Sequence, residues 1–599
     1  MTAGRFTSSD SIRNARALRH AASVRFEGPF ALELGGTLPG VSICYETWGT
    51  LSAARGNAIL VCHAISGDSH AAKHDADDDP GWWDVLIGPG KAIDTGRWFV
   101  ICPNVLGGCR GTTGPGSIDP ATGSPWGSRF PTLTVGDMVA AHALLLDHLG
   151  IERLHAAVGG SLGGHQVLEL ATRFPERVAG AVALATSPHL TSQALAFDVV
   201  GRNAIFRDPN YHAADGDTGA TPTVGLAIAR MLGHITYLSR EAMMQKFGAN
   251  RIALESSATA FERRFEVGSY LAHQGEKFVE RFDANSYVTL SLAMDLFSLG
   301  ETHEALVERF AASRCAWLVV SFSTDWLFPP FQSKQMVDAL LAAGRPVAAC
   351  TVESRCGHDA FLLEDDLDRY GCMVEGFLDR LVDGVACDPD AEPAGLDPRS
   401  IFQARRIDYD LIVELIDPGA SVLDLGCGGG GLLARLASRG HGRLVGVELD
   451  EREIVTAVRR GLPVVQADLA EGLACFHDGE FDVVVLSQTL QAVRDVDALV
   501  AEMLRVGRRC VVSFPNVGHH AHRRRLAEEG RAPVPSFLGA HRWYDTPDVR
   551  AVSIADFEDY CAERSIRVLR HLALDSAAGK RVSEDPNRNA DVAVFVIAR

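Results

Sequence analysis

The stretch that most constrains the fold is 158–164, where Ser161 stands between paired glycines in the sequence VGGSLGG. Residues 154–158 read as a short buried strand, and residues 165–178 carry apolar side chains at helical spacing. Glycines permit a sharp turn with positive φ because they have no Cβ. The pattern strand, G-x-S-x-G, helix therefore predicts a serine whose hydroxyl is exposed at a tight turn.

Length and composition indicate a globular protein of more than one domain. The chain has 599 residues, of which 47% are hydrophobic and 22% charged, and its formal net charge is −19. That charge argues against nucleic acid or an anionic membrane as a general partner. No apolar run is long enough to span a bilayer.

The cysteines and the N-terminus indicate a cytoplasmic protein. The thirteen cysteines are an odd number, are scattered through strand-like segments and include no C-x-x-C pair. Reduced thiols fit this pattern better than disulfides or zinc, so no metal site is expected. Residues 1–20 have no apolar core for a secretory signal and are predicted to be a flexible tail.

Two further polar residues follow predicted strands and complete a catalytic order. Asp325 follows the strand 316–321, and His358 follows the strand 347–352. The order Ser161, Asp325, His358 is that of an α/β-hydrolase fold, the α/β fold class that we expect here. A serine hydroxyl is a weak nucleophile, so the histidine must accept its proton and the aspartate must orient the histidine.

Other segments have places in the same fold. Strands are predicted over 41–47, 57–62, 98–103 and 178–185, with a capped helix over 132–149 and a helical lid over about 187–309. The backbone amides of Ile65 and Leu162 are the candidate oxyanion hole. We interpret His63 as a residue that braces its loop. Arg110, in a glycine-rich loop with exposed amides, either faces a ligand or braces that loop.

The segments HAISGDSH, NVLGGCRGTTGP, GGSLGG, ARMLGHITYLS, STDW and GHDAF resemble the homoserine O-acetyltransferase family over roughly residues 21–383. The resemblance implies ping-pong transfer of an acetyl group from acetyl-CoA, through an acyl-Ser161, to the side-chain hydroxyl of L-homoserine. It also implies that Arg230 and Asp359 bind the amino acid, which suits a zwitterion. Relatives are commonly dimers that pair through lid helices, so a homodimer is expected.

The acyl donor rests on Trp326 and Leu327. The succinyl-CoA branch of this family often has Arg directly after the Asp-Trp pair, where this chain has Leu327. An apolar side chain offers a succinyl carboxylate no partner, and burial of an unpaired charge is costly. We therefore expect acetyl transfer. Homoserine O-succinyltransferase and a serine esterase with the same triad are the alternatives.

A second module is predicted at 399–599, after a linker at 384–398 that is rich in Pro, Asp, Gly and Ala. The strand 421–425 contains Asp424 and opens into a turn with Gly426 and Gly428. Glu448 ends the next strand, and Asp468 follows the third. In a Rossmann-like fold these residues could hold a nucleotide, and the glycine spacing favours a class I methyltransferase-type domain with S-adenosylmethionine.

The segments SVLDLGCG, GVELD, VVQADLAEGL, FDVVVLSQTLQAV, EMLRVGRRCVVSFPN and RWYDTP resemble the MetW family of methionine-biosynthesis proteins. Gly429 stands where that family commonly has Asp after Gly-Cys-Gly, which weakens the expectation of a bound cofactor. The resemblance implies a role in support of the acyltransferase. We therefore favour a non-catalytic module over a methyltransferase. The run 523–525 is interpreted as a solvated basic helix face.

Overall fold

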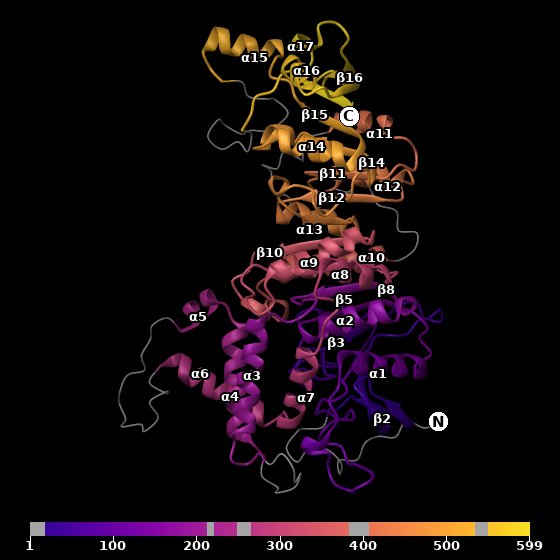
Figure 1. Ribbon diagram of the computed structural model, residues 1–599, viewed down its shortest axis with the longest axis vertical. Coiled ribbons are helices and arrows are strands. Elements are labelled where there is room, and N and C mark those ends of the chain that lie inside the picture. Colours follow the sequence, from indigo (N-terminus) through magenta and orange to yellow (C-terminus); the bar gives the residue numbers. More distant parts are fainter. Residues whose placement is uncertain (1–17, 212–220, 248–264, 382–405, 533–548) are drawn as a thin grey trace. The chain divides into compact units, whose positions relative to one another are not determined.

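The computed structural model describes residues 18–211, 221–247, 265–381, 406–532 and 549–599, which fall into two compact units. The first unit ends at Leu381 and the second begins at Val382. The predicted linker 384–398, residues 1–17 of the predicted tail and the RWYDTP segment lie outside the described residues. Figure 1 shows the elements of each unit, which are described separately below.

The first unit is built on a sheet with the strand order β1-β2-β6-β3-β7-β8-β9-β10. The central strands β6, β3, β7, β8 and β9 are parallel, whereas β2 runs antiparallel to both β1 and β6. Every residue of β3 and β7 is buried, as expected for parallel strands covered on both faces. The strands are β1 (Ala22–Ala31), β2 (Thr37–Trp48), β3 (Ala58–Cys62), β6 (Phe99–Pro103), β7 (Leu154–Gly160), β8 (Val178–Leu184), β9 (Ala316–Phe322) and β10 (Val347–Val352). Between β3 and β6 in the sequence, β4 (Ile87–Gly88) and β5 (Ile93–Asp94) form a separate two-stranded sheet.

Helices α1 and α2 follow from local signals in the sequence. α1 (Val135–His148) begins after Thr134, whose side chain forms a capping box with Asp137, as the sequence predicts. α2 spans Leu162–Arg173, so the predicted continuation of this helix to Val178 is wrong. Pro175 opens a 3₁₀ turn, because proline lacks the N–H that a helix needs and disfavours helical backbone at the residue before it.

The segment between β8 and β9 is the predicted helical insertion. Its described residues form helices and one isolated bridge between His189 and Ser298. α4 packs against both α3 and α6, and these helices stand together in Figure 1. The helices are α3 (Ser192–Phe206), α4 (Thr223–Tyr237), α5 (Arg240–Phe247), α6 (Glu266–Val279), α7 (Ala284–Asp295) and α8 (His303–Ala311), and α9 (Pro330–Ala342) and α10 (Leu367–Arg380) complete the unit.

The second unit has the strand order β13-β12-β11-β14-β15-β18-β16-β17. The first five strands are parallel in the doubly wound order, which confirms the Rossmann-like prediction, and β18 enters antiparallel beside β15. The strands are β11 (Val422–Leu425), β12 (Leu444–Glu448), β13 (Val464–Gln466), β14 (Phe481–Ser487), β15 (Gly507–Pro515), β16 (Arg567–Asp575), β17 (Lys580–Arg581) and β18 (Val592–Ala598). The helices are α11 (Ile407–Leu415), α12 (Gly431–Ser438), α13 (Glu451–Arg459), α14 (Val496–Val506), α15 (His520–Arg524), α16 (Ile554–Glu563) and α17 (Pro586–Asn589).

Candidate active site

Ser161 occupies the turn between β7 and α2 in a backbone conformation that side chains rarely adopt. Its φ is 58° and its ψ is −127°. The turn is too tight for side chains at its neighbours: a Cβ on Gly159 would lie 2.4 Å from the Gly163 carbonyl oxygen, and one on Gly163 would lie 2.1 Å from that of Cys62. The glycines of the motif are thus required by close approach of the backbone.

His358 and Asp325 meet beyond the ends of neighbouring strands. His358 Nδ1 lies 2.8 Å from Asp325 Oδ2, and both side chains are buried. Asp325 Oδ1 accepts hydrogen bonds from the amides of Leu327 and Phe328, at 3.0 Å and 2.9 Å. Because the carboxylate holds the Nδ1 proton, Nε2 is the nitrogen left to accept a proton.

The charge state of His358 is set by opposing influences. Burial lowers the pKa of His358, but the charge and hydrogen bond of Asp325, together with the charge of Asp359, outweigh burial and raise the pKa above its usual value. Stabilisation of the imidazolium is what a base needs when it takes a proton from a hydroxyl.

The loop that carries Ile65 is held by His63. Nε2 of His63 accepts a hydrogen bond from the Val105 amide at 2.9 Å, and its Nδ1 lies 2.8 Å from the Ala64 carbonyl oxygen. The Gln166 side chain donates to the His63 carbonyl oxygen at 3.1 Å. The two imidazole nitrogens therefore contact backbone groups of this loop and of the loop after β6, which fits a bracing role. Leu162 is the first residue of α2, where a helix leaves its amides without intrahelical acceptors.

A cavity of about 30 Å³ opens at Ser161. Leu327 lines the cavity, whereas Trp326 is outside the lining, is 37% exposed and packs edge-on against Phe197, with ring centroids 5.4 Å apart. Asp198 is the one acidic or basic side chain among the lining residues, which are Ile65, Ser161, Leu190, Ala194, Phe197, Asp198, Ala229, Leu232, Gly233, Thr236, Tyr237, Tyr287, Met294, Leu327 and Phe328. The wall beside the candidate nucleophile is therefore mainly apolar.

Asp198 faces a second carboxyl group, that of Asp295. Asp198 Oδ2 and Asp295 Oδ1 are both buried, and neither has a hydrogen-bond donor among the described residues. Burial and the nearby Asp295 raise the pKa of Asp198 well above its usual value. A single proton held between the two oxygens would satisfy both. Arg202 binds the other oxygen of Asp295, so the pair keeps a single, already neutralised charge.

Arg230 and Asp359 lie near one another beside the candidate triad. The Arg230 guanidinium stands 5.6 Å from the ring centre of Tyr237 and 4.7 Å from that of Phe278. Burial raises the pKa of Asp359, and the charges of His358 and Arg230 act against that rise. A cation and a carboxyl group thus stand close to His358, as binding of a zwitterion requires.

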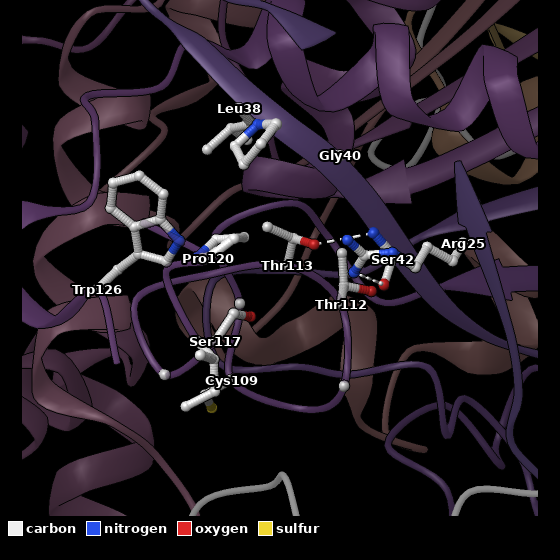
Figure 2. A pocket seen from close by; sticks show the side chains of 15 residues that line it. Arg25, Leu38, Gly40, Ser42, Cys109, Thr112, Thr113, Ser117, Pro120 and Trp126 are labelled. Carbon is white, nitrogen blue, oxygen red and sulfur yellow. Dashed lines mark hydrogen bonds between the residues drawn. The ribbon is translucent and has the colours of Figure 1, made fainter. Parts of the chain in front are cut away.

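The glycine-rich loop lines a separate cavity of about 200 Å³ (Figure 2). The hydroxyls of this loop bind β2. Thr113 accepts a hydrogen bond from the Ser42 amide at 2.8 Å, and Thr112 accepts one from the Cys44 amide at 2.9 Å. Arg110 lies outside the lining of this cavity and forms an ion pair with Asp68 at 3.7 Å. These contacts fit loop bracing.

One group of side chains in the first unit has the composition of a metal site, which the sequence did not predict. Glu46 Oε2 lies 2.9 Å from His70 Nδ1 and 2.9 Å from His74 Nε2. The hydrogen bond to Glu46 raises the pKa of His70 to about 9. The buried carboxylate is thus paired with an imidazolium, which satisfies its charge.

In the second unit, the predicted nucleotide residues gather at the ends of β11 and β12. Gly426 and Gly428 have positive φ. Glu448 accepts hydrogen bonds from the amides of Gly428, Leu449 and Asp450, at 2.7 to 3.0 Å. Burial raises the pKa of Asp424 to about 7. Asp468 instead caps a 3₁₀ turn through the Ala470 amide.

The strand order of the first unit, the turn at Ser161 and the His358–Asp325 pair are those of the α/β-hydrolase class of enzymes. Residues 57–365 match the family described as alpha/beta hydrolase fold, and residues 406–597 match the family described as methionine biosynthesis protein MetW. A relative from Rhodopirellula baltica, described as a bifunctional methionine biosynthesis protein MetXA/MetW, is 49% identical over 99% of this chain and 95% of its own. The chain belongs to this bifunctional MetXA/MetW family.

Relatives that match only the first unit are named for the transfer of two different acyl groups. A homoserine O-acetyltransferase from Gluconobacter oxydans is 50% identical, over 62% of this chain and 96% of its own. A homoserine O-succinyltransferase from Acidithiobacillus ferrooxidans is 47% identical, over 61% of this chain and 95% of its own.

Two solved structures share the fold of the first unit. The homoserine O-acetyltransferase from Bacillus anthracis is 30% identical, with a TM-score of 0.55, and covers 61% of this chain and 99% of its own. Esterase E22 is 28% identical, with a TM-score of 0.54, and covers 60% of this chain and 100% of its own. No helix among the described residues is long and apolar enough to cross a membrane.

Several residues at the site were not singled out by the sequence analysis. Asp198, Asp295 and Tyr237 belong to helices of the lid. Tertiary packing brings Asp198 to the cavity of Ser161 and Tyr237 to His358, and Asp295 interacts with Asp198. In a helical pattern that already contains exposed polar residues, a buried carboxyl group cannot be distinguished from an exposed one. The one available signal was the position of Tyr237 in the ARMLGHITYLS segment.

Proposed function

We propose that the first unit is a homoserine O-acetyltransferase. His358 takes the proton of the Ser161 hydroxyl, whose oxygen attacks the thioester of acetyl-CoA; CoA leaves with that proton as its thiol. His358 then takes the proton of the homoserine hydroxyl, which attacks the acetyl-serine and regenerates Ser161. Asp325 keeps the imidazole oriented and stabilises its cation in both halves. No cofactor other than the acyl-CoA substrate is needed.

The residues around the triad have complementary roles in this proposal. The amides of Ile65 and Leu162 stabilise the negative oxygen of each tetrahedral intermediate. Arg230 pairs with the carboxylate of L-homoserine, and Asp359 pairs with its ammonium group. The acetyl group occupies the cavity at Ser161.

The observation that carries the choice of donor is the composition of that cavity. It is small and mainly apolar, and its one acidic or basic lining side chain is Asp198, whose pKa is raised well above its usual value by burial and by Asp295. A succinyl group would place a second carboxylate where the lining offers it no cation, and such burial costs several kcal/mol, roughly 2–7 even for an uncharged polar group. Leu327 and Asp198 therefore favour acetyl-CoA over succinyl-CoA.

The decisive experiment measures CoA thiol release with and without L-homoserine, using acetyl-CoA and succinyl-CoA in parallel. We expect release that depends on homoserine, prefers acetyl-CoA and disappears in Ser161→Ala. Preference for succinyl-CoA would overturn the donor assignment and leave the triad intact. Release that ignores homoserine would indicate an esterase, the activity named for one of the similar structures.

For the second unit we propose a non-catalytic role in support of the acyltransferase. The residues fit an adenosine-type ligand in part: the glycine turn is open to close approach, but the Glu448 oxygens already accept three backbone amides. Asp468 is a weaker candidate for a ligand contact, because its side chain already caps a 3₁₀ turn through the Ala470 amide. Calorimetry with S-adenosylmethionine, compared between wild type and Glu448→Gln, tests the site. Transfer of a labelled methyl group to an acceptor in cell extract would refute the non-catalytic role.

We further propose that the protein is a cytoplasmic homodimer that pairs through its lid. The described cysteines form no disulfide with one another, in keeping with a reducing compartment. Large apolar side chains are exposed on lid helices, including Val200, Val224 and Ile228. Light scattering should give twice the chain mass, and Val200→Asp with Ile228→Asp should reduce that mass to one chain; a wild-type monomer would refute the proposal.

A further inference from the structure

The lid carries three cationic side chains that converge on one histidine, and the acyl-transfer steps use only one of them. The guanidiniums of Arg230 and Arg281 both stand over the Phe278 ring, at 4.7 Å and 5.3 Å from its centre. The Lys246 ammonium lies 4.0 Å from the ring centre of Tyr270. All three charges act on His234, whose pKa is lowered to about 3 by burial and by Arg230, Lys246 and Arg281. We call these four residues the lid cation cluster.

His234 presents an unused donor to this cluster. The side chain is only 7% exposed, and its Nε2 has no hydrogen-bond partner among the described residues. Its Nδ1 lies 3.4 Å from the Tyr270 hydroxyl, which can donate to it. With Nδ1 as the acceptor, the neutral imidazole carries its proton on Nε2. A buried N–H without an acceptor is costly, and an anion among the cations would satisfy it.

Among the described residues, neighbouring acids do not neutralise the cluster. Asp359 is the carboxyl group that faces Arg230, and burial raises its pKa. Asp68 acts on Arg281 but also pairs with Arg110, a further cation. Mutual repulsion is visible at Arg281, whose pKa is lowered by burial and then by the charge of Arg230. Such a concentration of positive charge in a protein of formal net charge −19 needs a function.

Arg281 links the cluster to the reaction site. Its guanidinium donates to the Ser66 carbonyl oxygen at 2.9 Å, directly after Ile65 in the chain. Arg230 interacts with Tyr237, which lines the cavity of Ser161. A ligand whose acyl end lies at Ser161 could therefore reach the cluster with another part of the same molecule.

We propose that the lid cation cluster binds a phosphate group of the acyl-CoA donor. This inference rests on the proposed acyl transfer and adds the site for the charged end of the donor. A homoserine carboxylate needs one guanidinium, which Arg230 supplies. Lys246, Arg281 and the His234 N–H remain for a second anion, and phosphate oxygens accept several such donors at once.

The test compares two acetyl donors that differ in their phosphates. Acetyl-CoA carries phosphates, and S-acetyl-N-acetylcysteamine carries the same thioester without them. Lys246→Met should raise the KM for acetyl-CoA about fivefold, the size of a partly exposed charge pair, and leave the KM for the small thioester and for homoserine unchanged. Lys277→Met, which removes an exposed lysine from α6 of the same lid, is the matched control and should change neither KM.

His234 supplies an independent variant pair. His234→Leu removes the donor and should raise the KM for acetyl-CoA about tenfold, whereas His234→Gln keeps an N–H in place of Nε2 and should restore most of the affinity. Equal changes for both donors would assign a structural role to the cluster and overturn the proposal. A rise in the KM for homoserine alone would assign the cluster to the amino acid and also overturn it.

Binding of free CoA separates this inference from the proposed activity. Calorimetry should show tighter binding of CoA to wild type than to Lys246→Met, with the difference abolished by high salt. This result would support the phosphate site even if wild type transferred no acyl group to homoserine. Equal affinity in the two proteins would refute the site even if acyl transfer were active.

Discussion

Replacement of Leu327 by arginine is the sharpest test of how the acyl cavity selects its donor. Leu327 lines the cavity of Ser161, while its backbone amide donates to Asp325. The substitution changes only the side chain, so the hydrogen bond that orients the triad is retained. The introduced guanidinium would give a succinyl carboxylate the partner that the wild-type lining lacks.

The magnitude follows from two opposing effects. A charge-assisted pair contributes about 1.5–3 kcal/mol, which corresponds to roughly a 10- to 150-fold gain for succinyl-CoA. The larger side chain also overpacks a cavity of about 30 Å³, at a cost of about 1–3 kcal/mol that falls on both donors. The ratio of kcat/KM values for succinyl-CoA and acetyl-CoA isolates the first effect, and we expect it to rise at least tenfold.

The assay is thiol release at saturating homoserine with each donor, for wild type, Leu327→Arg and Leu327→Arg with Asp198→Asn. The amide of the double variant supplies an N–H that can donate to Asp295 and leaves the net charge of the pair unchanged, so the ratio should equal that of Leu327→Arg alone. A folded Leu327→Arg protein whose ratio stays within threefold of wild type would refute the reasoning that the cavity wall sets donor choice.

Further predictions concern the triad and a buried ion pair. Asp325→Asn should lower kcat by about 10⁴ in thiol-release assays, with an unchanged thermal transition; loss below tenfold would contradict the triad. Because the pKa of His358 is raised, kcat/KM should increase with pH through a value above 6.5, the ordinary pKa of histidine; a profile flat from pH 6 to 9 would contradict this. The pairing with Glu46 raises the pKa of His70 to about 9. This ion pair therefore adds roughly 3 kcal/mol to the free energy of unfolding. The contribution is complete below pH 6.5 and is lost as pH rises through 9. Denaturant unfolding of wild type and His70→Gln should therefore differ most at pH 6 and converge by pH 10.

Local signals in the sequence were sufficient for the elements that position the triad. The elbow at Ser161 is specified by glycines that the backbone requires, and α1 begins at the capping box of Thr134. The strands β3 and β7 are short runs of apolar residues, which are diagnostic in a parallel sheet. Both boundaries of α2 differ from the predicted range 165–178: the helix begins at Leu162, directly after the elbow, and ends at Arg173 before Pro175.

Tertiary contacts between helices could not be predicted from the same patterns. Asp198 and Asp295 are 97 positions apart in the chain, and nothing local indicates that their carboxyl groups interact. The unused donor of His234 exists only because α4 is buried against α6. In the second unit the sequence placed Glu448 at the end of a strand, but not the three backbone amides that already bind it.

We predict that one proton is held between Asp198 and Asp295 in the folded enzyme, because their two unpartnered carboxyl oxygens are buried and the pKa of Asp198 is raised. The formal charge of −19 counts both carboxyl groups as ionised, so such a proton makes the folded chain one unit less negative. Unfolding at neutral pH separates the two groups and releases that proton to the solvent. The heat of unfolding must then depend on the ionisation enthalpy of the buffer, and in Asp198→Asn that dependence should fall by one proton.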